Sequence, residues 1–228
     1  TRGAPARGSG ALTAVLPNGR VYLIEKNAQF GGGLAYSTGN AQHLLNVRAS
    51  RMSAFVDEPD HFTNWLRRRN NSEPAVAPPK SVDTFVPRQL YGAYIQDLLG
   101  NEIWQSGRGR NLHLIPDEAT AIEQQPDGLV VEVGTGRRYE VDGAVLAVGN
   151  FPNEDATKHY YGNPWDARAT ANLDPQAAVL LIGTGLTMVD SVISLLDNGH
   201  RGRIYAVSRR GLLPRRHGDA PPHSSAWL

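Results

Sequence analysis

The stretch from Val179 to Gly211 constrains the fold of this chain more than any other. Its first four residues, ending at Ile182, form an apolar run that is too short for a helix and typical of a buried parallel strand. The turn Gly183-Thr184-Gly185 follows, and apolar residues at helical spacing then continue until Asn198-Gly199 ends the helix. A second strand is predicted from Ile204 to Ser208. Strand, glycine turn, helix and strand in this order are typical of one half of a dinucleotide-binding fold.

The glycine turn predicts a pyrophosphate site. A helix N-terminus offers unpaired N–H groups and the positive end of the helix dipole, and glycine lets phosphate oxygens approach them. After the second strand, Ser208, Arg209 and Arg210 stand where an NAD site carries an acidic residue. A hydroxyl and two guanidinium groups can bind a ribose 2′-phosphate, whereas a carboxylate would repel it. The sequence therefore favours NADPH, and a solvated basic loop is the alternative.

An earlier segment predicts a second nucleotide site. Val21 to Ile24 reads as a strand, and Glu25 lies at its C-terminal end. A carboxylate there can accept two hydrogen bonds from an adenosine ribose, and Gly31-Gly32-Gly33 would let the backbone pass near a cofactor. The alternative is a surface glutamate before a flexible loop.

The remaining segments predict a mixture of helices, strands and loops. The mixture of small polar and apolar residues over 36–55 is typical of a folded loop that lines a site. His61 is expected on the surface. The other expected elements are helices over 60–69 and 90–99, a loop or lid over 70–81, short strands over 112–115 and 120–123, a hairpin of 129–133 and 138–141 around Gly134-Thr135-Gly136, a buried strand over 144–148 and an irregular connection over 153–175.

Composition excludes several classes of function. The 228 residues carry a net charge of +1 with scattered arginines, so no nucleic-acid partner is expected. The absence of cysteine excludes disulfides, thiolate metal sites and a redox-active dithiol. No segment approaches membrane-spanning length, and a soluble, cytoplasmic protein is expected. The seven histidines lack metal-ligand spacing, and motifs of hydrolases and phosphotransferases are missing, so no metal site is expected.

Five segments together resemble the bacterial FAD/NAD(P)-binding protein family over residues 19–217: Glu25, the loop LLNVRASRMSAF, FVPRQLYGAY, LAVGNFP and IGTGLTMVD. That family includes uncharacterised oxidoreductases and one type of FAD-dependent urate hydroxylase, and it is similar in plan to N-hydroxylating and Baeyer–Villiger flavin monooxygenases. The resemblance implies an α/β fold with two Rossmann-like dinucleotide-binding domains of the glutathione-reductase type. It also implies FAD in the first domain, NADPH in the second, and hydride transfer from the nicotinamide to the flavin.

The resemblance also implies roles for individual residues. It puts Glu25 on the adenosine ribose of FAD, Gly31 and Gly33 near the cofactor, Asn46 and Ser53 beside the flavin, Arg88 and Gln89 at cofactor or substrate, Ala119 at a backbone contact to adenine, and Gly149 in a motif that resembles A-T-G. NADPH is assigned to Gly183, Thr184, Gly185, Ser208, Arg209 and Arg210.

The chain departs from the family at its start. The family opens with an apolar strand and a G-x-G-x-x-G turn that holds the FAD pyrophosphate, and neither precedes Val21. We therefore expect a fragment with both domains incomplete: an FAD-binding domain over 1–160 that lacks its first strand and glycine-rich turn, and the start of an NAD(P)-binding domain over 174–228.

The expected function is that of an NADPH-dependent FAD oxidoreductase, a flavin monooxygenase acting on a small-molecule substrate. No catalytic residue is assigned, because the cofactor supplies the chemistry and the protein positions and shields it. The alternative is a non-catalytic nucleotide-binding module, a flavoprotein that has lost its first phosphate site.

Overall fold

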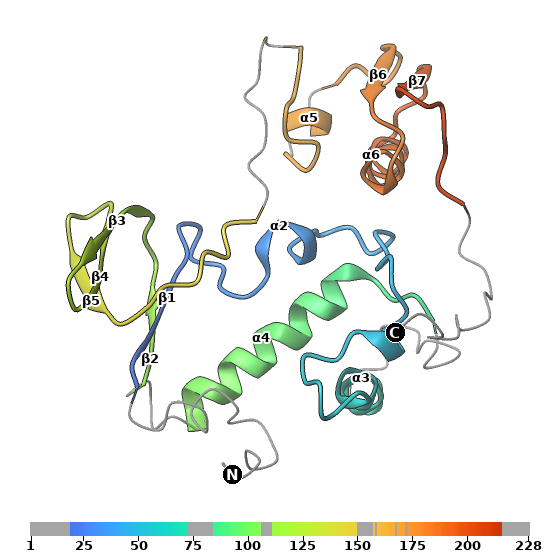
Figure 1. Ribbon diagram of the computed structural model, residues 1–228. Helices are drawn as coiled ribbons and strands as arrows, with labels where there is room; N and C mark the ends of the chain where they lie inside the picture. Colours follow the sequence, from blue (N-terminus) through green and yellow to red (C-terminus); the bar gives the residue numbers. More distant parts are fainter. Residues whose placement is uncertain are drawn as a thin grey trace. The chain divides into compact units, whose positions relative to one another are not determined.

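A computed structural model of the chain describes residues 19–72, 84–105, 111–149, 157, 159–166, 168–171 and 173–215. Residues 1–151 and 152–228 form two compact units, named unit 1 and unit 2. Each unit contains helices and a pair of parallel strands (Figure 1), which confirms the expected mixed α/β class. The domain limits 1–160 and 174–228 stay predictions.

Unit 1 contains a parallel strand pair. Strand β1 (Val21–Ile24) lies beside β2 (Leu112–Ile115), in register from Val21↔Leu112 to Ile24↔Ile115, and both strands span the residues predicted for them. Parallel neighbours need a crossover connection, so the chain between them builds the helices of this unit. These are α2 (Gly33–Tyr36), the 3₁₀ helix η1 (Ala49–Arg51), α3 (His61–Ser72) and α4 (Arg88–Gln105).

The helices and the loop over 36–55 enclose an aromatic core. Its buried side chains are Leu45, Ala49, Phe62, Trp65, Leu66, Val86, Leu90 and Tyr94. Helices α3 and α4 confirm the two predicted helices. Helix α4 is longer at both ends, whereas α3 begins one residue later than predicted and continues through residues 70–72, which were expected in a loop. The rest of that predicted loop, residues 73–81, lies outside the described residues. The loop over 36–55 is folded, as predicted, because Leu45 and Ala49 anchor it in the core.

The prediction that His61 lies on the surface is wrong. Its Nδ1 atom lies 2.8 Å from the hydroxyl oxygen of the fully buried Tyr94, and its ring packs edge-on against Phe55 with centroids 4.8 Å apart. Helical spacing in the sequence locates His61 at the start of α3 but does not reveal that α4 packs against that position. Tertiary packing decides its half-buried environment.

An antiparallel meander follows β2. Strands β3 (Ala119–Gln125), β4 (Gly128–Val133) and β5 (Arg138–Val141) lie in the order β3-β4-β5. The hairpin predicted around Gly134-Thr135-Gly136 is confirmed, and the strand predicted over 120–123 is longer at both ends. Alternation of the side chains buries Val131 and Val133 on one face, as the period-two pattern requires.

The prediction of a buried strand over 144–148 is wrong. No strand is formed there, and Val145, Leu146 and Val148 are 94%, 71% and 62% exposed. A strand needs a hydrogen-bonded neighbour, and none of the described residues pairs with this segment. Its apolar residues therefore remain exposed.

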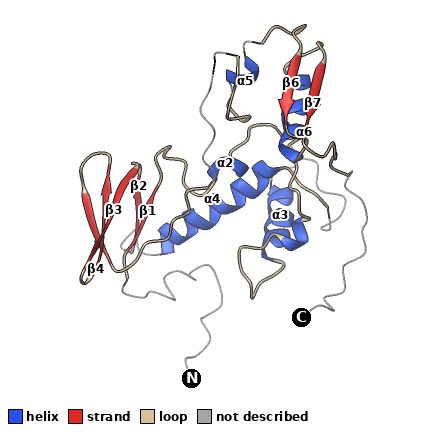
Figure 2. Cartoon of the chain, turned by 45° about the horizontal axis from the view of Figure 1, so that its top comes forward, coloured by secondary structure: helices blue, strands red, loops and turns tan. Residues whose placement is uncertain are grey.

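Unit 2 contains the second parallel pair. Strand β6 (Val179–Ile182) pairs with β7 (Ile204–Val207), and α6 (Leu186–Asp197) connects them (Figure 2). The strand, turn, helix and strand predicted from the sequence are confirmed, with β7 one residue shorter. Asn198 caps the end of α6, and the N–H of Gly199 donates to the carbonyl oxygen of Leu196 at 3.0 Å.

The prediction that β6 is buried is wrong for one of its faces. Leu180 and Ile182 are 59% and 74% exposed, and their partners on β7, Tyr205 and Val207, are each 50% exposed. A parallel strand is buried only when both faces of its sheet are covered. The connection between β6 and β7 supplies one crossover helix, α6, and the other face stays open in the described part of unit 2.

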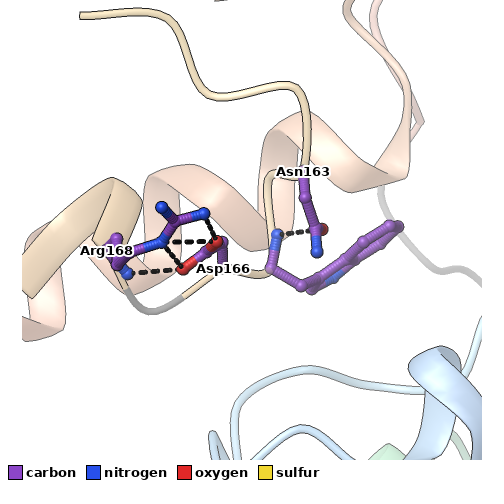
Figure 3. A network of polar contacts seen from close by, with 4 residues as sticks. Asn163, Asp166 and Arg168 are labelled. Atoms are coloured by element: carbon purple, nitrogen blue, oxygen red, sulfur yellow. Dashed lines mark hydrogen bonds and ion pairs between the residues drawn. The ribbon is translucent and has the colours of Figure 1, made fainter. Parts of the chain in front are cut away.

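The connection expected to be irregular over 153–175 contains a short helix, α5 (Arg168–Ala171). Asp166 precedes it and accepts hydrogen bonds from the backbone N–H of Arg168 at 2.8 Å and from its Nε atom at 2.9 Å (Figure 3). The Arg168 guanidinium group holds the pKa of the Asp166 carboxyl below its usual value. Asn163 accepts from the N–H of Trp165 at 3.1 Å in the same turn.

Candidate functional site

The turn between β6 and α6 is open. Gly183 has φ +114°, a conformation that residues with a side chain rarely adopt, and its N–H donates to the Val207 carbonyl oxygen at 2.7 Å. A Cβ atom added at Gly183 or Gly185 would meet no heavy atom within 4 Å. The backbone of this turn is therefore accessible to a ligand.

Helix α6 begins at this turn without a side-chain cap. Gly185 is the N-cap residue, and the first turn of the twelve-residue helix contains no acidic side chain. The positive end of the helix dipole and the N–H groups of the first turn are thus not neutralised by a carboxylate of the helix itself. An anion is the ligand that this end of α6 favours.

Two cationic side chains follow the neighbouring strand. Arg209 and Arg210 come directly after Ser208, which follows β7, and both are exposed. Neither forms an ion pair with another described residue. Because β6 and β7 are parallel, their carboxyl ends share one edge of the sheet, which places the glycine turn and the arginines at the same edge.

A contact between two hydroxyl groups joins the turn to the residues after β7. Thr184 Oγ1 lies 2.8 Å from Ser208 Oγ and 2.5 Å from the Leu212 carbonyl oxygen, and the N–H of Gly211 donates to Ser208 Oγ at 3.0 Å. The structure thus brings together all six residues predicted to hold NADPH. The sequence did not predict Gly211 and Leu212 as part of this site. Both residues contribute backbone groups, which the residue type does not reveal. The one distinguishing feature of either residue is the positive φ of Gly211, +64°.

In unit 1, Glu25 and Ala119 lie near the carboxyl ends of β1 and β2. The N–H of Glu25 donates to the Ile115 carbonyl oxygen at 3.1 Å, and Lys26 forms an exposed ion pair with Glu118 at 3.4 Å. Glu25 Oε1 accepts from the N–H of Asn27 at 3.0 Å, so this oxygen orders the local turn. The Oε2 atom has no hydrogen-bond partner among the described residues and can accept from a ribose hydroxyl.

The glycines after β1 differ in their surroundings. Gly31 packs against α4, where an added Cβ would lie 2.9 Å from the Cγ2 atom of Ile95. At Gly33 an added Cβ would meet nothing within 4 Å. The packing of unit 1 explains Gly31, and Gly33 alone has the free space that a nearby cofactor requires.

The other predicted residues of unit 1 lie on two further segments. Arg88 and Gln89 begin α4, and the Arg88 Nε atom donates to the Leu44 carbonyl oxygen at 2.9 Å, two residues before the exposed Asn46. The Ser53 hydroxyl lies 2.6 Å from the Glu58 carbonyl oxygen and accepts from the N–H of Phe55 at 3.1 Å, so it stabilises its own loop.

Gly149 stands apart from these groups. It is exposed at the end of the unpaired segment over 143–149, with φ +66°. An added Cβ would meet nothing within 4 Å. No described contact joins Gly149 to the other predicted residues, and the neighbouring residues 150–152 of its motif lie outside the described residues.

Comparison with known proteins gives the family. The model of the FAD-NAD(P)-binding family matches residues 3–151, which is more than half of the chain. This chain belongs to that family. FAD and NAD(P) are accordingly its cofactors, which confirms the family and the cofactor types expected from the sequence. A search of curated proteins gave no significant match.

A search of solved structures also gave a match. The lysine monooxygenase NbtG from Nocardia farcinica, which has an NADPH domain, matches 88% of this chain at 17% identity, with a TM-score of 0.47. The match covers 54% of that enzyme, so this chain spans about half the length of the structure it resembles.

The described residues of both units fit parts of the two cofactors of this family. In unit 2, the open turn and the arginines fit the pyrophosphate and a 2′-phosphate. In unit 1, the free oxygen of Glu25 fits the adenosine ribose of FAD.

The described residues contain no group of three His, Cys, Asp or Glu side chains that could hold a metal ion, and none of their helices is long and apolar enough to cross a membrane.

Proposed function

We propose that unit 2 binds NADPH, and that the protein to which this chain belongs is an NADPH-dependent FAD oxidoreductase. The observation that carries the proposal is the shared edge of β6 and β7. There the open Gly183-Thr184-Gly185 turn begins α6, and Arg209 and Arg210 follow β7 without an ion pair among the described residues. The turn offers N–H groups to the pyrophosphate, and the arginines offer guanidinium groups to the 2′-phosphate.

Unit 1 is proposed to hold the adenosine end of FAD at the carboxyl edge of β1 and β2. Glu25 would accept from the ribose hydroxyls, and the backbone at Ala119 would contact the adenine. When bound, the two cofactors supply the redox chemistry: a hydride is transferred from NADPH to FAD, and O₂ is then used to oxidise a small molecule.

We further propose that the protein has two domains of the glutathione-reductase type and is related to the urate-hydroxylase and N-hydroxylating monooxygenases. We also propose that it is cytoplasmic and has no nucleic-acid or membrane partner.

Isothermal titration of the chain with NADP⁺ and NAD⁺ tests the site in unit 2. The expected result is tighter binding of NADP⁺. Replacing one arginine, in Arg209→Gln or Arg210→Gln, should weaken NADP⁺ binding by about tenfold or more and leave NAD⁺ nearly unchanged, because a charge-assisted hydrogen bond contributes about 1.5–3 kcal/mol. Arg203→Gln is the matched control: it removes the same charge at the opposite end of β7 and should change neither affinity.

The glycine turn is tested with Gly185→Ala. Gly185 has φ −80° and free space around it, so alanine should not disturb the fold. Its methyl group would occupy space beside the N–H groups of α6, and binding of NADP⁺ and NAD⁺ should fall by the same factor. Unchanged binding of both nucleotides would remove the turn from the site.

The oxidoreductase activity is tested on the intact protein by its flavin absorbance and its consumption of NADPH. A yellow protein that oxidises NADPH supports the proposal. Binding of NADP⁺ with no flavin and no NADPH oxidation would instead favour the non-catalytic nucleotide-binding module.

A further inference from the structure

The hydroxyl pair Thr184 and Ser208 connects two segments that the sequence separates by a helix and a strand. Thr184 lies in the glycine turn before α6, and Ser208 follows β7. Their oxygens are 2.8 Å apart, within hydrogen-bond distance. The basic loop, residues 208–212, is therefore attached to the glycine turn at Ser208 and again at Leu212, whose carbonyl oxygen lies 2.5 Å from Thr184 Oγ1.

The number of hydrogens decides what each hydroxyl can do. A hydroxyl has one hydrogen to donate and two lone pairs that accept. The Leu212 carbonyl oxygen has no hydrogen, so its contact with Thr184 uses the Thr184 hydrogen. The contact between the two hydroxyls then requires the hydrogen of Ser208, while Ser208 Oγ also accepts from the N–H of Gly211 at 3.0 Å.

This arrangement leaves Ser208 without a hydrogen for a ligand. A phosphate group accepts hydrogen bonds and needs donors, which the guanidinium groups of Arg209 and Arg210 supply. These two arginines lie between Ser208 and Gly211, so the hydrogen bond between Ser208 and Gly211 closes the loop around them.

We propose that Thr184 and Ser208 are positioning residues that set the preference for NADPH over NADH without touching the 2′-phosphate. They hold the basic loop in one conformation relative to the glycine turn, so that both arginines face the same phosphate when the pyrophosphate occupies the turn. This inference rests on the proposed function of unit 2 and assigns Ser208 a role other than the direct ligand expected from the sequence.

The experiment measures the affinities of NADP⁺, NAD⁺ and 2′,5′-ADP for the chain and four variants by isothermal titration. Thr184→Val keeps the shape and removes the hydroxyl, Ser208→Ala removes its partner, and the third variant combines both. Each single variant should weaken NADP⁺ and 2′,5′-ADP binding about three- to tenfold, the size expected for one hydrogen bond, and leave NAD⁺ within about twofold. The double variant should lose less binding than the sum of the two single losses, because both changes break the contact that the two hydroxyls share.

The fourth variant, Thr184→Ser, restores the hydroxyl and should bind NADP⁺ like the unchanged chain. A ligand-free measurement supports the titration: amide hydrogen exchange at Gly211 should become faster in Thr184→Val and in Ser208→Ala. If Thr184→Val does not fold by circular dichroism, Thr184→Ala takes its place.

The outcomes separate the two proposals. If the unchanged chain binds NADP⁺ no better than NAD⁺, the NADPH assignment falls and the positioning role falls with it. If the chain prefers NADP⁺ and Ser208→Ala weakens that binding while Thr184→Val does not, Ser208 is a direct phosphate ligand and the positioning role alone is overturned. Additive losses in the double variant would overturn it as well.

Discussion

Gly92 of α4 lies directly against the backbone of Tyr36, the last residue of α2. A Cβ atom at Gly92 would collide with the Tyr36 carbonyl oxygen and lie 3.3 Å from its carbonyl carbon. The close approach lets α2 rest on the N-terminal part of α4, which positions the glycines that precede α2. The absence of a side chain at residue 92 is therefore a packing requirement of unit 1.

Gly92→Ala should lower the free energy of unfolding of unit 1 by about 1–3 kcal/mol, the usual effect of overpacking. Gly100→Ala in the same helix is the matched control. An added Cβ at Gly100 meets nothing within 4 Å, and alanine should stabilise α4 by up to about 1 kcal/mol. Urea unfolding followed by circular dichroism measures both effects. Equal effects of the two substitutions would contradict the packing argument.

A hydrogen bond between two helices gives a second prediction. The indole Nε1 of the buried Trp65 in α3 donates to Asp97 Oδ2 in α4 at 2.8 Å. Asp97→Ala should lower the unfolding free energy by about 1 kcal/mol, since the indole N–H loses its acceptor and only water can replace it. Asp97→Asn keeps an acceptor oxygen and should cost less in the same urea titration. An asparagine loss as large as the alanine loss would show that the negative charge of Asp97, and not the acceptor oxygen alone, stabilises the contact.

The Tyr94 hydroxyl gives a third prediction. It accepts from the Ala54 N–H at 3.3 Å and lies 2.8 Å from His61 Nδ1. Burial raises the pKa of Tyr94, so the hydroxyl keeps its proton at neutral pH. Tyr94→Phe leaves both partners unpaired and should lower the unfolding free energy by about 1–2 kcal/mol.

Tyr91→Phe is the control for Tyr94→Phe. Tyr91 belongs to the same aromatic cluster, and its hydroxyl has no hydrogen-bond partner among the described residues. Removing that hydroxyl should change stability by less than about 0.5 kcal/mol. Thermal unfolding of the two variants in parallel makes the comparison, and a Tyr91→Phe loss as large as that of Tyr94→Phe would refute the role of the hydrogen bonds.

A fourth prediction concerns acid pH. The Thr135 hydroxyl donates to Asp117 at 2.7 Å, and together with the N–H of Glu118 at 2.8 Å it holds the pKa of the Asp117 carboxyl below its usual value. A pKa that is lower in the folded state stabilises the fold above the unfolded-state pKa, and this stabilisation is lost as the pH falls through the folded-state pKa. Thr135→Val should therefore raise the pKa of Asp117 and flatten the acid side of the stability profile.

NMR titration of the Asp117 carboxyl carbon measures that shift. Thr120→Val is the matched control, because the Thr120 hydroxyl donates to the Glu132 carbonyl oxygen and not to Asp117. It should leave the pKa of Asp117 unchanged. An unaltered pKa in Thr135→Val would assign the shift to the backbone donors alone.

Local signals in the sequence predicted the elements well. The spans of β1, β2 and β6 follow directly from short apolar runs bounded by turn residues, and the turn over 134–136 follows from its glycines. The six residues at the edge of β6 and β7 could be predicted together because they lie at fixed positions of one strand, helix and strand unit. Hydrogen bonds of helices and turns join residues near one another in the chain, so their pattern is visible in the sequence.

Burial and the connections between distant residues could not be read in the same way. The sequence of residues 144–148 and of β6 is apolar, yet Val145 and Ile182 are exposed, because burial depends on which neighbours cover a strand and not on the strand itself. His61 was misassigned for the same reason. Gly31 packs closely against Ile95, and the Ser53 hydroxyl contacts the Glu58 carbonyl oxygen. Neither role could be predicted from the sequence, because each depends on a partner that the fold supplies.

The order of strands and helices, the glycine turn before α6 and the chemistry of the side chains after β7 can all be predicted from the amino-acid sequence. Tertiary structure alone decided that the Thr184 hydroxyl meets Ser208 and Leu212, 24 and 28 residues further along the chain. The physical reason is that a hydroxyl hydrogen bond has no periodic signature. It forms only where the backbone brings two polar atoms within about 3 Å of each other.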